Sequence, residues 1–342
     1  MDARLWHQQA RMTPPPAPQR LSLKELRNLT GAPKAEYLRR RRRWLSGLQF
    51  TFDEGLRATT QLTDLVDTNQ LRPPGAKDVI GISAPFAVGK STLVRSWAQG
   101  IYRDIIGSGI NDPAQPTWQM GDGVVADHVP VAWLDMIAAA KIKAFNTQLL
   151  RFFGYPVHGA IRDLTDRIAD AVDNHKLQLL IVDDANLLNF RHRDSRDVLD
   201  HLKHVNTLLG QRGASMVLVG ADLENSPIAK DPQMAGRMRI IRLRPFNVDT
   251  ENGVQDWQQF LFGIEQTVLP YLPAAEPHLL AGKLSPRIWR RTQGYVGDTV
   301  RLIADAAHLA ALDDCWTIKA THLERVSLSE RATTDQPIAR AV

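Results

Sequence analysis

The stretch GISAPFAVGKSTLVRSW, residues 81–97, constrains the fold more than any other part of the chain. It ends like a phosphate-binding loop, with Gly89 to Thr92 reading GKST, although Ala84 replaces the first glycine of G-x-x-x-x-G-K-[ST]. A short apolar run, residues 77–83, precedes the loop, and apolar residues at helical spacing follow it. Backbone N–H groups at such a strand–loop–helix junction bind phosphate oxygens. The stretch therefore predicts a nucleotide site.

The loop chemistry predicts ATP and Mg²⁺ as cofactors. Lys90 would reach the β and γ phosphates, and Ser91 would offer its hydroxyl to Mg²⁺. Thr92 would pack in the helix or contact the α phosphate. Ala84 is excluded from its position only if the backbone there needs a positive φ. The predicted nucleotide-binding residues of the loop are Ala84, Pro85, Phe86, Ala87, Val88, Gly89, Lys90, Ser91 and Thr92.

The second half of the predicted site is LLIVDDANLL, about ninety residues further along the chain. An apolar strand ending in Asp183 would place this carboxylate beside the loop, on a neighbouring strand, where it can hold magnesium. Asp184 would orient or deprotonate the attacking water. Capping of the next helix is the alternative role for two aspartates in this position.

Strand and helix patterns alternate through the middle of the chain. Continuous apolar runs of this kind are typical of buried parallel strands. Strands are expected over 77–83, 128–135, 177–184, 215–222 and 239–246, with helices over 139–153, 160–175 and 194–209. The pattern predicts an α/β fold, a five-stranded parallel sheet with helices on both faces. Residues 250–330 look all-helical.

The expected domains are a basic helical N-terminal arm (1–75), an α/β nucleotide-binding domain (76–246), a helical lid (247–330) and a tail (331–342). Residues 12–20, MTPPPAPQR, cannot form a helix, whereas 22–67 has a helical pattern. Residues 1–75 carry 13 Lys and Arg against 7 Asp and Glu, a net charge of +6, and the remainder carries 29 against 30, a net charge of −1.

The basic excess centres on an unbroken arginine run. Runs of one charge often mark contacts with nucleic acid, and a solvated helix is the alternative. The run consists of Arg39, Arg40, Arg41, Arg42 and Arg43.

Several classes of protein are disfavoured. Cys315 is the single cysteine, so neither a disulfide framework nor a cysteine-ligated zinc site is expected. His201 and His204 share a helical face, but a solvated helix surface is expected there rather than a metal site. No apolar run approaches the ~18 residues of a membrane span, and the N-terminus lacks a secretory apolar region, so a cytoplasmic protein is expected.

A parallel sheet followed by a helical lid is the layout of AAA+ ATPases, and the chain resembles the TniB/TnsC group of transposition ATPases found in actinobacterial mobile elements. The resemblance covers roughly residues 50–328. It rests on GISAPFAVGKSTL, LLIVDDANLLN, DHLKHVNTLL, VLVGADLE, MAGRMRIIRLRPF and TQGYVGDTVRLIADAA.

The resemblance implies further roles. Asp222 would be the polar sensor of the γ-phosphate, and Arg237 would be the arginine finger supplied to the next subunit's ATP, with Arg239 as the competing candidate. Arg301 would be the second sensor, in the lid. The family usually has Glu where this chain has Asp184, and the shorter side chain implies slow hydrolysis with ATP serving mainly for assembly.

The implied function is that of an ATP-dependent regulator of transposition, a homo-oligomer that forms a ring or filament on duplex DNA and recruits a transposase. Lys141 and Lys143 are the implied DNA contacts, and a solvated first helical turn is their alternative. The arginine run would clamp DNA or meet the transposase. Two rival functions remain: an AAA+ replication loader, for which a winged helix after the lid would argue, and a non-hydrolysing nucleotide switch, which the shortened Asp184 favours.

Overall fold

The computed structural model describes residues 1–121, 123–137, 140–188 and 195–334. The chain divides into two compact units. The α/β unit contains residues 1–12, 54–86 and 90–243, and the helical unit contains residues 13–53, 87–89 and those from 244 onward. The segment 1–75, expected to be one arm, therefore contributes to both units.

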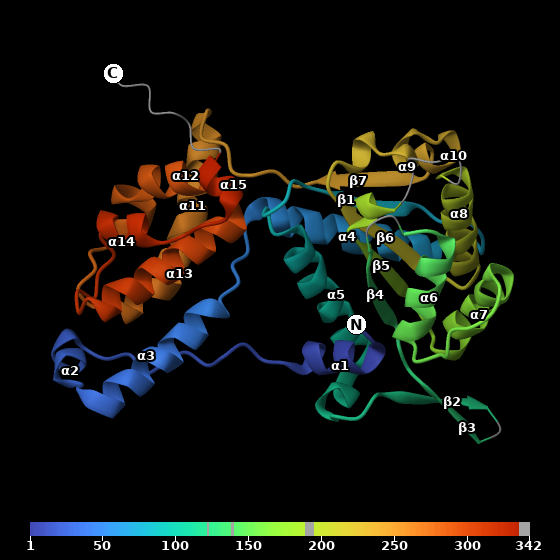
Figure 1. The fold of residues 1–342 in the computed structure, drawn as a ribbon, viewed down its shortest axis with the longest axis horizontal. Coiled ribbons are helices and arrows are strands. Elements are labelled where there is room, and N and C mark those ends of the chain that lie inside the picture. The colour runs from blue at the N-terminus through green and yellow to red at the C-terminus, as the bar shows by residue number, and fades with distance from the viewer. Residues whose placement is uncertain (122, 138–139, 189–194, 335–342) are drawn as a thin grey trace. The chain divides into compact units, whose positions relative to one another are not determined.

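The α/β unit is built on a five-stranded parallel sheet, as predicted (Figure 1). All strands but one are entirely buried or nearly so, which agrees with their continuous apolar sequences. The strands, in chain order, are β1 (Val79–Ser83), β4 (Val131–Asp135), β5 (Leu179–Asp183), β6 (Ser215–Gly220) and β7 (Met238–Arg242). Their order across the sheet is β4-β5-β6-β1-β7.

Strand order corrects one expectation. Asp183 ends β5 and the phosphate-loop candidate follows β1, but β6 lies between these two strands. The prediction that the loop and Asp183 come from neighbouring strands is therefore wrong. Both segments still begin at the same edge, because the strands are parallel and their carboxyl ends coincide.

The described part of the α/β unit also contains helices, two of them short, and three 3₁₀ turns. The helices are α1 (Ala3–Arg11), α4 (Asp53–Leu71), α5 (Lys90–Ile106), α6 (Ile142–Phe152), α7 (Ile161–Asn174), α8 (Ser195–Gln211), α9 (Pro227–Lys230) and α10 (Pro232–Ala235), and the 3₁₀ turns are η1 (Gly107–Asn111), η2 (Ala185–Leu187) and η3 (Leu223–Asn225). Helix α1 was not predicted. It is anchored by Trp6, which stacks on Trp133 with ring centroids 5.8 Å apart, and by His7, whose Nδ1 lies 2.9 Å from the Tyr102 hydroxyl.

A two-stranded antiparallel hairpin was also missed by the sequence patterns. It comprises β2 (Thr117–Gly121) and β3 (Val124–Asp127) and forms a sheet separate from the main one (Figure 1). Its residues are mostly exposed, so the hairpin has no apolar alternation by which a strand could be recognised.

The helical unit combines an N-terminal pair of helices with the C-terminal part of the chain. Its elements are α2 (Leu23–Asn28), α3 (Gly31–Ser46), α11 (Glu251–Val268), the 3₁₀ turn η4 (Leu269–Tyr271), the π-helical turn η5 (Leu279–Lys283), α12 (Ser285–Thr292), α13 (Val296–Leu312), α14 (Ala320–Arg325) and α15 (Glu330–Thr334). The helical pattern expected over 22–67 is thus broken into α2, α3 and α4, while residues 12–20 form no helix, as predicted.

Helix α3 packs against α13 within the helical unit. The Arg41 guanidinium donates a hydrogen bond to the Ala307 carbonyl at 3.0 Å, and Trp44 lies against Tyr271 with ring centroids 4.3 Å apart. No helix in the described part of the chain is long and apolar enough to cross a membrane.

Candidate nucleotide-binding site

The phosphate-loop candidate occupies residues 84–89, between the end of β1 and the start of α5. Ala84 is buried, and its N–H donates to the Gly220 carbonyl at 3.1 Å. Its φ is not positive; the positive φ values in the loop belong to Ala87 (66°) and Gly89 (94°). A glycine is therefore not required at position 84, and the retained Gly89 stands where the backbone turns into the helix.

Lys90 and Ser91 begin α5, so they stand at the positive end of a helix. The Lys90 side chain is buried, and its ammonium lies 4.9 Å from the centre of the exposed Phe86 ring. The Ser91 hydroxyl donates to a carboxylate oxygen of Asp183 at 3.1 Å. The structure thus brings together the two residues that the sequence predicted as metal ligands, although they are 92 positions apart.

Asp183 is buried at the carboxyl end of the sheet. Burial raises the pKa of its carboxyl group, although hydrogen bonds from the Asp184 N–H and the Ser91 hydroxyl lower the pKa. Asp184 and Asp135 add negative charge nearby, which also raises this pKa. Asp183 and the Ser91 hydroxyl offer oxygen ligands, and Mg²⁺ is usually held by one or two carboxylates together with water and phosphate, so these two residues fit Mg²⁺.

Asp184 has a left-handed backbone conformation, with φ 52° and ψ 39°. The predicted role of Asp184 in holding the attacking water stays a prediction. Helix capping, the alternative role, is not observed in the 3₁₀ turn that follows, where Asp184 makes no capping hydrogen bond with its side chain.

Asp222 lies two residues beyond β6, the strand between β5 and β1. Its side chain is exposed and accepts a hydrogen bond from Asn225 Nδ2 at 2.5 Å, within its own turn. Asp222 therefore lies at the same carboxyl edge of the sheet as the phosphate loop and Asp183. The sensor role itself stays a prediction.

Asn186 and Glu224, for which the sequence predicted no role, connect the loops at the carboxyl edge of the sheet. Asn186 Oδ1 accepts the Ala221 N–H at 3.1 Å, and a Cβ on Gly220 would lie 2.9 Å from the same oxygen. Glu224 accepts a hydrogen bond from the Ser83 hydroxyl, directly before the phosphate loop. These contacts tie the β5, β6 and β1 loops to one another. In the sequence, the position of Asn186 inside LLIVDDANLL was the one indication of this connection.

The two arginine-finger candidates, Arg237 and Arg239, lie near the amino end of β7, whereas the phosphate loop follows the carboxyl end of β1. Arg237 immediately precedes β7, and its carbonyl accepts the Val79 N–H at the start of β1, whereas Arg242 pairs with Ser83 at the end. Five strand positions separate Arg237 from Arg242, roughly 15 Å of backbone. Neither Arg237 nor Arg239 is therefore close to the phosphate loop of its own subunit.

Arg237 and Arg239 differ in their surroundings. Arg239 forms an ion pair with the buried Asp78 at 3.5 Å, and Arg72 contacts the same carboxylate at 3.0 Å. Arg237 is exposed and makes no ion pair with any residue in the described ranges. A free guanidinium suits a finger better than one that already has a partner.

Arg301 lies on α13, in the helical unit. Its side chain is 62% exposed, and its Nε lies 3.8 Å from a carboxylate oxygen of Asp305, which is a weak surface ion pair. Asp305 is also bonded by Arg42 from α3. The second-sensor role of Arg301 stays a prediction.

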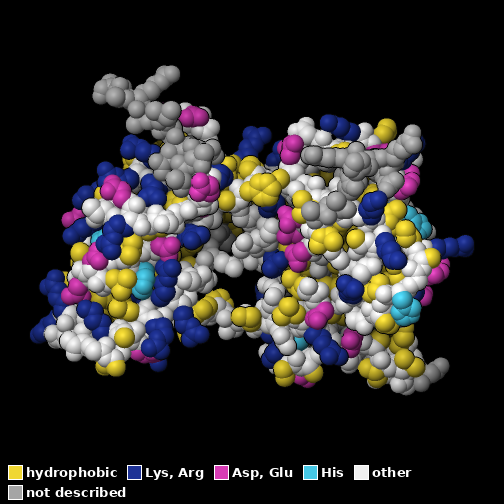
Figure 2. Space-filling view, in the orientation of Figure 1, with side chains coloured by type: hydrophobic (Ala, Val, Ile, Leu, Met, Phe, Trp, Pro, Cys, Tyr) yellow, Lys and Arg dark blue, Asp and Glu magenta, His cyan; other side chains and the backbone are white. Residues whose placement is uncertain are grey.

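The arginine run on α3 separates into different environments. Arg41 is buried, bonded to Ala307 and 5.9 Å from the Trp316 ring centre, and burial lowers its pKa to about 10. It cannot meet DNA, which corrects its inclusion among the DNA contacts. Arg42 pairs with Asp305, whereas Arg39 and Arg40 are exposed and share Glu36. Figure 2 shows the basic side chains of this unit scattered among acidic ones.

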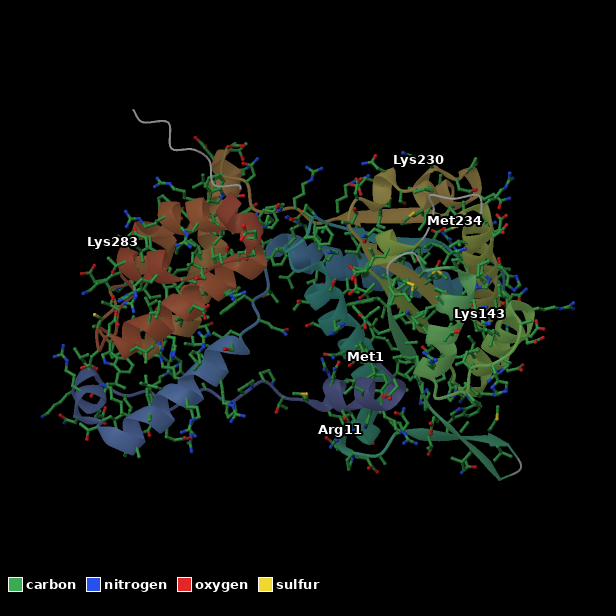
Figure 3. The ribbon with its side chains drawn as sticks, viewed as in Figure 1. Met1, Arg11, Lys143, Lys230, Met234 and Lys283 are labelled. Carbon is green, nitrogen blue, oxygen red and sulfur yellow. The ribbon has the colours of Figure 1, made fainter. Side chains whose placement is uncertain are left out.

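Lys141 and Lys143 lie at the start of α6, as predicted, and both are exposed. Lys141 is the N-cap residue and makes no capping hydrogen bond with its side chain. Figure 3 shows Lys143 on this helix. Lysine is a poor N-cap, and positive charge at a helix N-terminus is unfavourable for helix stability. These two lysines therefore create a concentration of positive charge that helix stability does not explain.

His201 on α8 is buried, so the expected solvated surface is wrong for this residue. Its Nε2 donates to Asn146 Oδ1 at 2.6 Å, and burial, with a smaller contribution from His204, lowers its pKa to about 4. Among the described residues, no cluster of three or more His, Cys, Asp and Glu side chains could hold a metal ion.

This histidine gives a prediction for acid stability. The pKa of His201 is lower in the folded protein than the ~6.5 of the unfolded chain. The free energy of unfolding is therefore highest above pH ~6.5. It falls as the pH drops towards 4, because the unfolded chain binds the proton more readily than the folded protein. We expect His201→Gln, which keeps a donor to Asn146, to reduce the loss of stability between pH 7 and pH 5 by about 2 kcal/mol.

Urea unfolding of His201→Gln and of the unchanged protein at both pH values measures this change. His204→Gln, at an exposed position on the same helix, is the control, and an equal change in both variants would contradict the assignment.

The chain matches one protein-family model and is similar in fold to solved structures. The family model "Bacterial TniB protein" matches residues 49–248, more than half of the chain. No curated protein matches. Among solved structures, the ADP form of the ORC2 protein of Aeropyrum pernix has a TM-score of 0.53 and 16% sequence identity, covering 81% of this chain and 67% of that one.

A second solved structure, Cdc6p from Pyrobaculum aerophilum, has a TM-score of 0.52 and 15% identity. The similarity covers 82% of this chain and 70% of that one. At such identities the likeness shows the fold alone. The chain therefore has an α/β P-loop fold with a five-stranded parallel sheet, which confirms the predicted fold class.

Proposed function

This chain belongs to the TniB family, and on that premise we propose that it is an ATP-dependent, DNA-binding regulator of transposition. In this proposal, ATP bound between subunits orders a homo-oligomer on duplex DNA, and the assembly recruits a transposase. The observation that carries the proposal is a separation within one sheet: the phosphate loop follows the carboxyl end of β1, whereas Arg237 precedes the amino end of β7. An ATP molecule can be contacted by both only if a second subunit supplies the arginine.

The chemistry of the site assigns each residue a part. Lys90 and the N–H groups of the loop hold the phosphates, and Asp183 with Ser91 would hold Mg²⁺, which supplies charge neutralisation when bound. Asp184 positions the attacking water. Because its side chain is one methylene shorter than the usual glutamate, we propose that hydrolysis is slow and that ATP serves mainly for assembly.

The DNA contact is proposed for the start of α6. Lys141, Lys143 and the helix N-terminus all favour an anion, and such contacts to phosphates carry little sequence information. The exposed members of the arginine run, Arg39, Arg40 and Arg43, are the second candidate surface.

Sedimentation tests the proposal directly. Purified protein would be run with ATP, with a non-hydrolysable analogue and with neither, each with and without duplex DNA, while released phosphate is measured. We expect large assemblies only where nucleotide and DNA are both present. Turnover should stay below about 1 s⁻¹, the slow end for enzymes. A monomer indifferent to DNA would favour a nucleotide switch instead.

A charge-reversal pair examines the DNA surface separately. Lys141→Glu with Lys143→Glu should lose assembly on DNA but keep nucleotide affinity. The competing variant is Arg39→Glu with Arg40→Glu, which changes the charge equally on α3, at the second candidate surface. If only this second variant fails to assemble, the DNA surface lies on the arginine run.

A further inference from the structure

The helical unit contains a pocket of about 650 Å³, a volume typical of ligand pockets. It is formed where η5 and α12 face the segment that leads into α14. Three aliphatic side chains, Leu279, Leu284 and Ile318, line it and are themselves buried. These residues give the pocket an apolar floor. We call it the lid pocket.

The rim of the lid pocket is strongly basic. Four of the lining residues are cationic: Lys283, Arg287, Arg290 and Lys319. Glu276 is the single acidic side chain among those that line it. Lys283, labelled in Figure 3, approaches Glu276 only to 3.9 Å, and both side chains are more than 70% exposed. Such a contact is worth little in water.

The other three cations differ in whether they have an ionic partner. Arg287 pairs at 3.5 Å with Glu324, an exposed residue outside the pocket lining. Arg290 and Lys319 are exposed and form no ion pair with any residue that the structure describes. The pocket lining thus carries four positive charges against one negative charge, above an apolar floor.

We propose that the lid pocket binds an acidic peptide segment that carries at least one aliphatic side chain. The aliphatic side chain would fill the floor, and the carboxylates would meet the rim, as in interfaces with an apolar anchor and a complementary charged border. A nucleic-acid backbone could satisfy the rim, but it has no aliphatic group for the floor. The pocket shares no residue with the nucleotide site or with the α6 lysines, so the inference does not rest on the proposed function.

Fluorescence polarisation with a labelled peptide tests this inference on the full chain. The probe is a short peptide of Asp and Glu with two leucines; its companions replace the leucines with serine, or the acids with Asn and Gln. We expect Arg290→Glu with Lys319→Glu to weaken binding of the acidic leucine peptide at least tenfold, about 1.4 kcal/mol. Both companion peptides should bind more weakly to the unchanged protein.

The matched control is Lys24→Glu with Arg27→Glu, an equal charge change at exposed positions of α2 in the same unit. It should leave peptide binding unchanged. An unchanged thermal unfolding transition, followed by circular dichroism, shows that each variant still folds, and Gln substitutions replace Glu if it does not. Equal weakening by the control, or equal binding of the serine peptide, would reduce the interaction to general charge attraction and overturn the proposal. Loss of binding to a short DNA duplex, with peptide binding intact, would overturn it in favour of nucleic acid.

Discussion

Lys90→Ala is expected to weaken ATP binding at least a hundredfold, about 3 kcal/mol, and to abolish ATP-dependent assembly. The ammonium group is buried at the start of α5, next to the hydroxyl–carboxylate contact of Ser91 and Asp183. Charge-assisted hydrogen bonds to phosphate are each worth about 1.5–3 kcal/mol. Alanine removes them and leaves the phosphates without their main cation.

Equilibrium binding of a fluorescent ATP analogue measures this effect. Lys230→Ala is the matched control, because Lys230 is an exposed lysine on α9 of the same unit (Figure 3). Unchanged affinity in Lys90→Ala would remove the phosphate-loop assignment and, with it, the nucleotide site proposed at this edge of the sheet.

Arg237→Ala is expected to leave ATP binding intact and to lower hydrolysis by a factor on the order of 10³, the usual effect of losing an arginine finger. The reason is geometric, since the residue precedes β7 at the sheet edge away from the phosphate loop. Arg239→Ala, in contrast, should keep hydrolysis and lose stability, because it leaves the buried Asp78 with one partner fewer.

Mixing two inactive variants distinguishes a finger supplied by the neighbour from an effect within one subunit. A Lys90→Ala subunit lacks a working phosphate loop but keeps Arg237, whereas an Arg237→Ala subunit has the opposite defect. In mixed assemblies some interfaces combine the two intact halves, so released phosphate should rise above that of either variant alone. Full hydrolysis by Arg237→Ala at saturating protein concentration would place the finger elsewhere.

The sequence alone determined the parallel sheet of the α/β unit and identified the candidate residues at its carboxyl edge. Continuous apolar runs marked all five strands of the sheet, and local chemistry identified the loop before α5 and the carboxylates after β5. These features depend on residues close together in the chain, so a pattern of spacing and polarity is enough to predict them. The same holds for the break at residues 12–20, where successive prolines exclude a helix.

The tertiary structure alone decided which distant residues meet. It placed β6 between β5 and β1, buried Arg41 against Ala307 although 266 positions separate them, and enclosed His201 beside Asn146. In the sequence, Arg41 is indistinguishable from its four arginine neighbours. Strand order and burial depend on packing between segments far apart in the chain, and local periodicity carries no information about that packing.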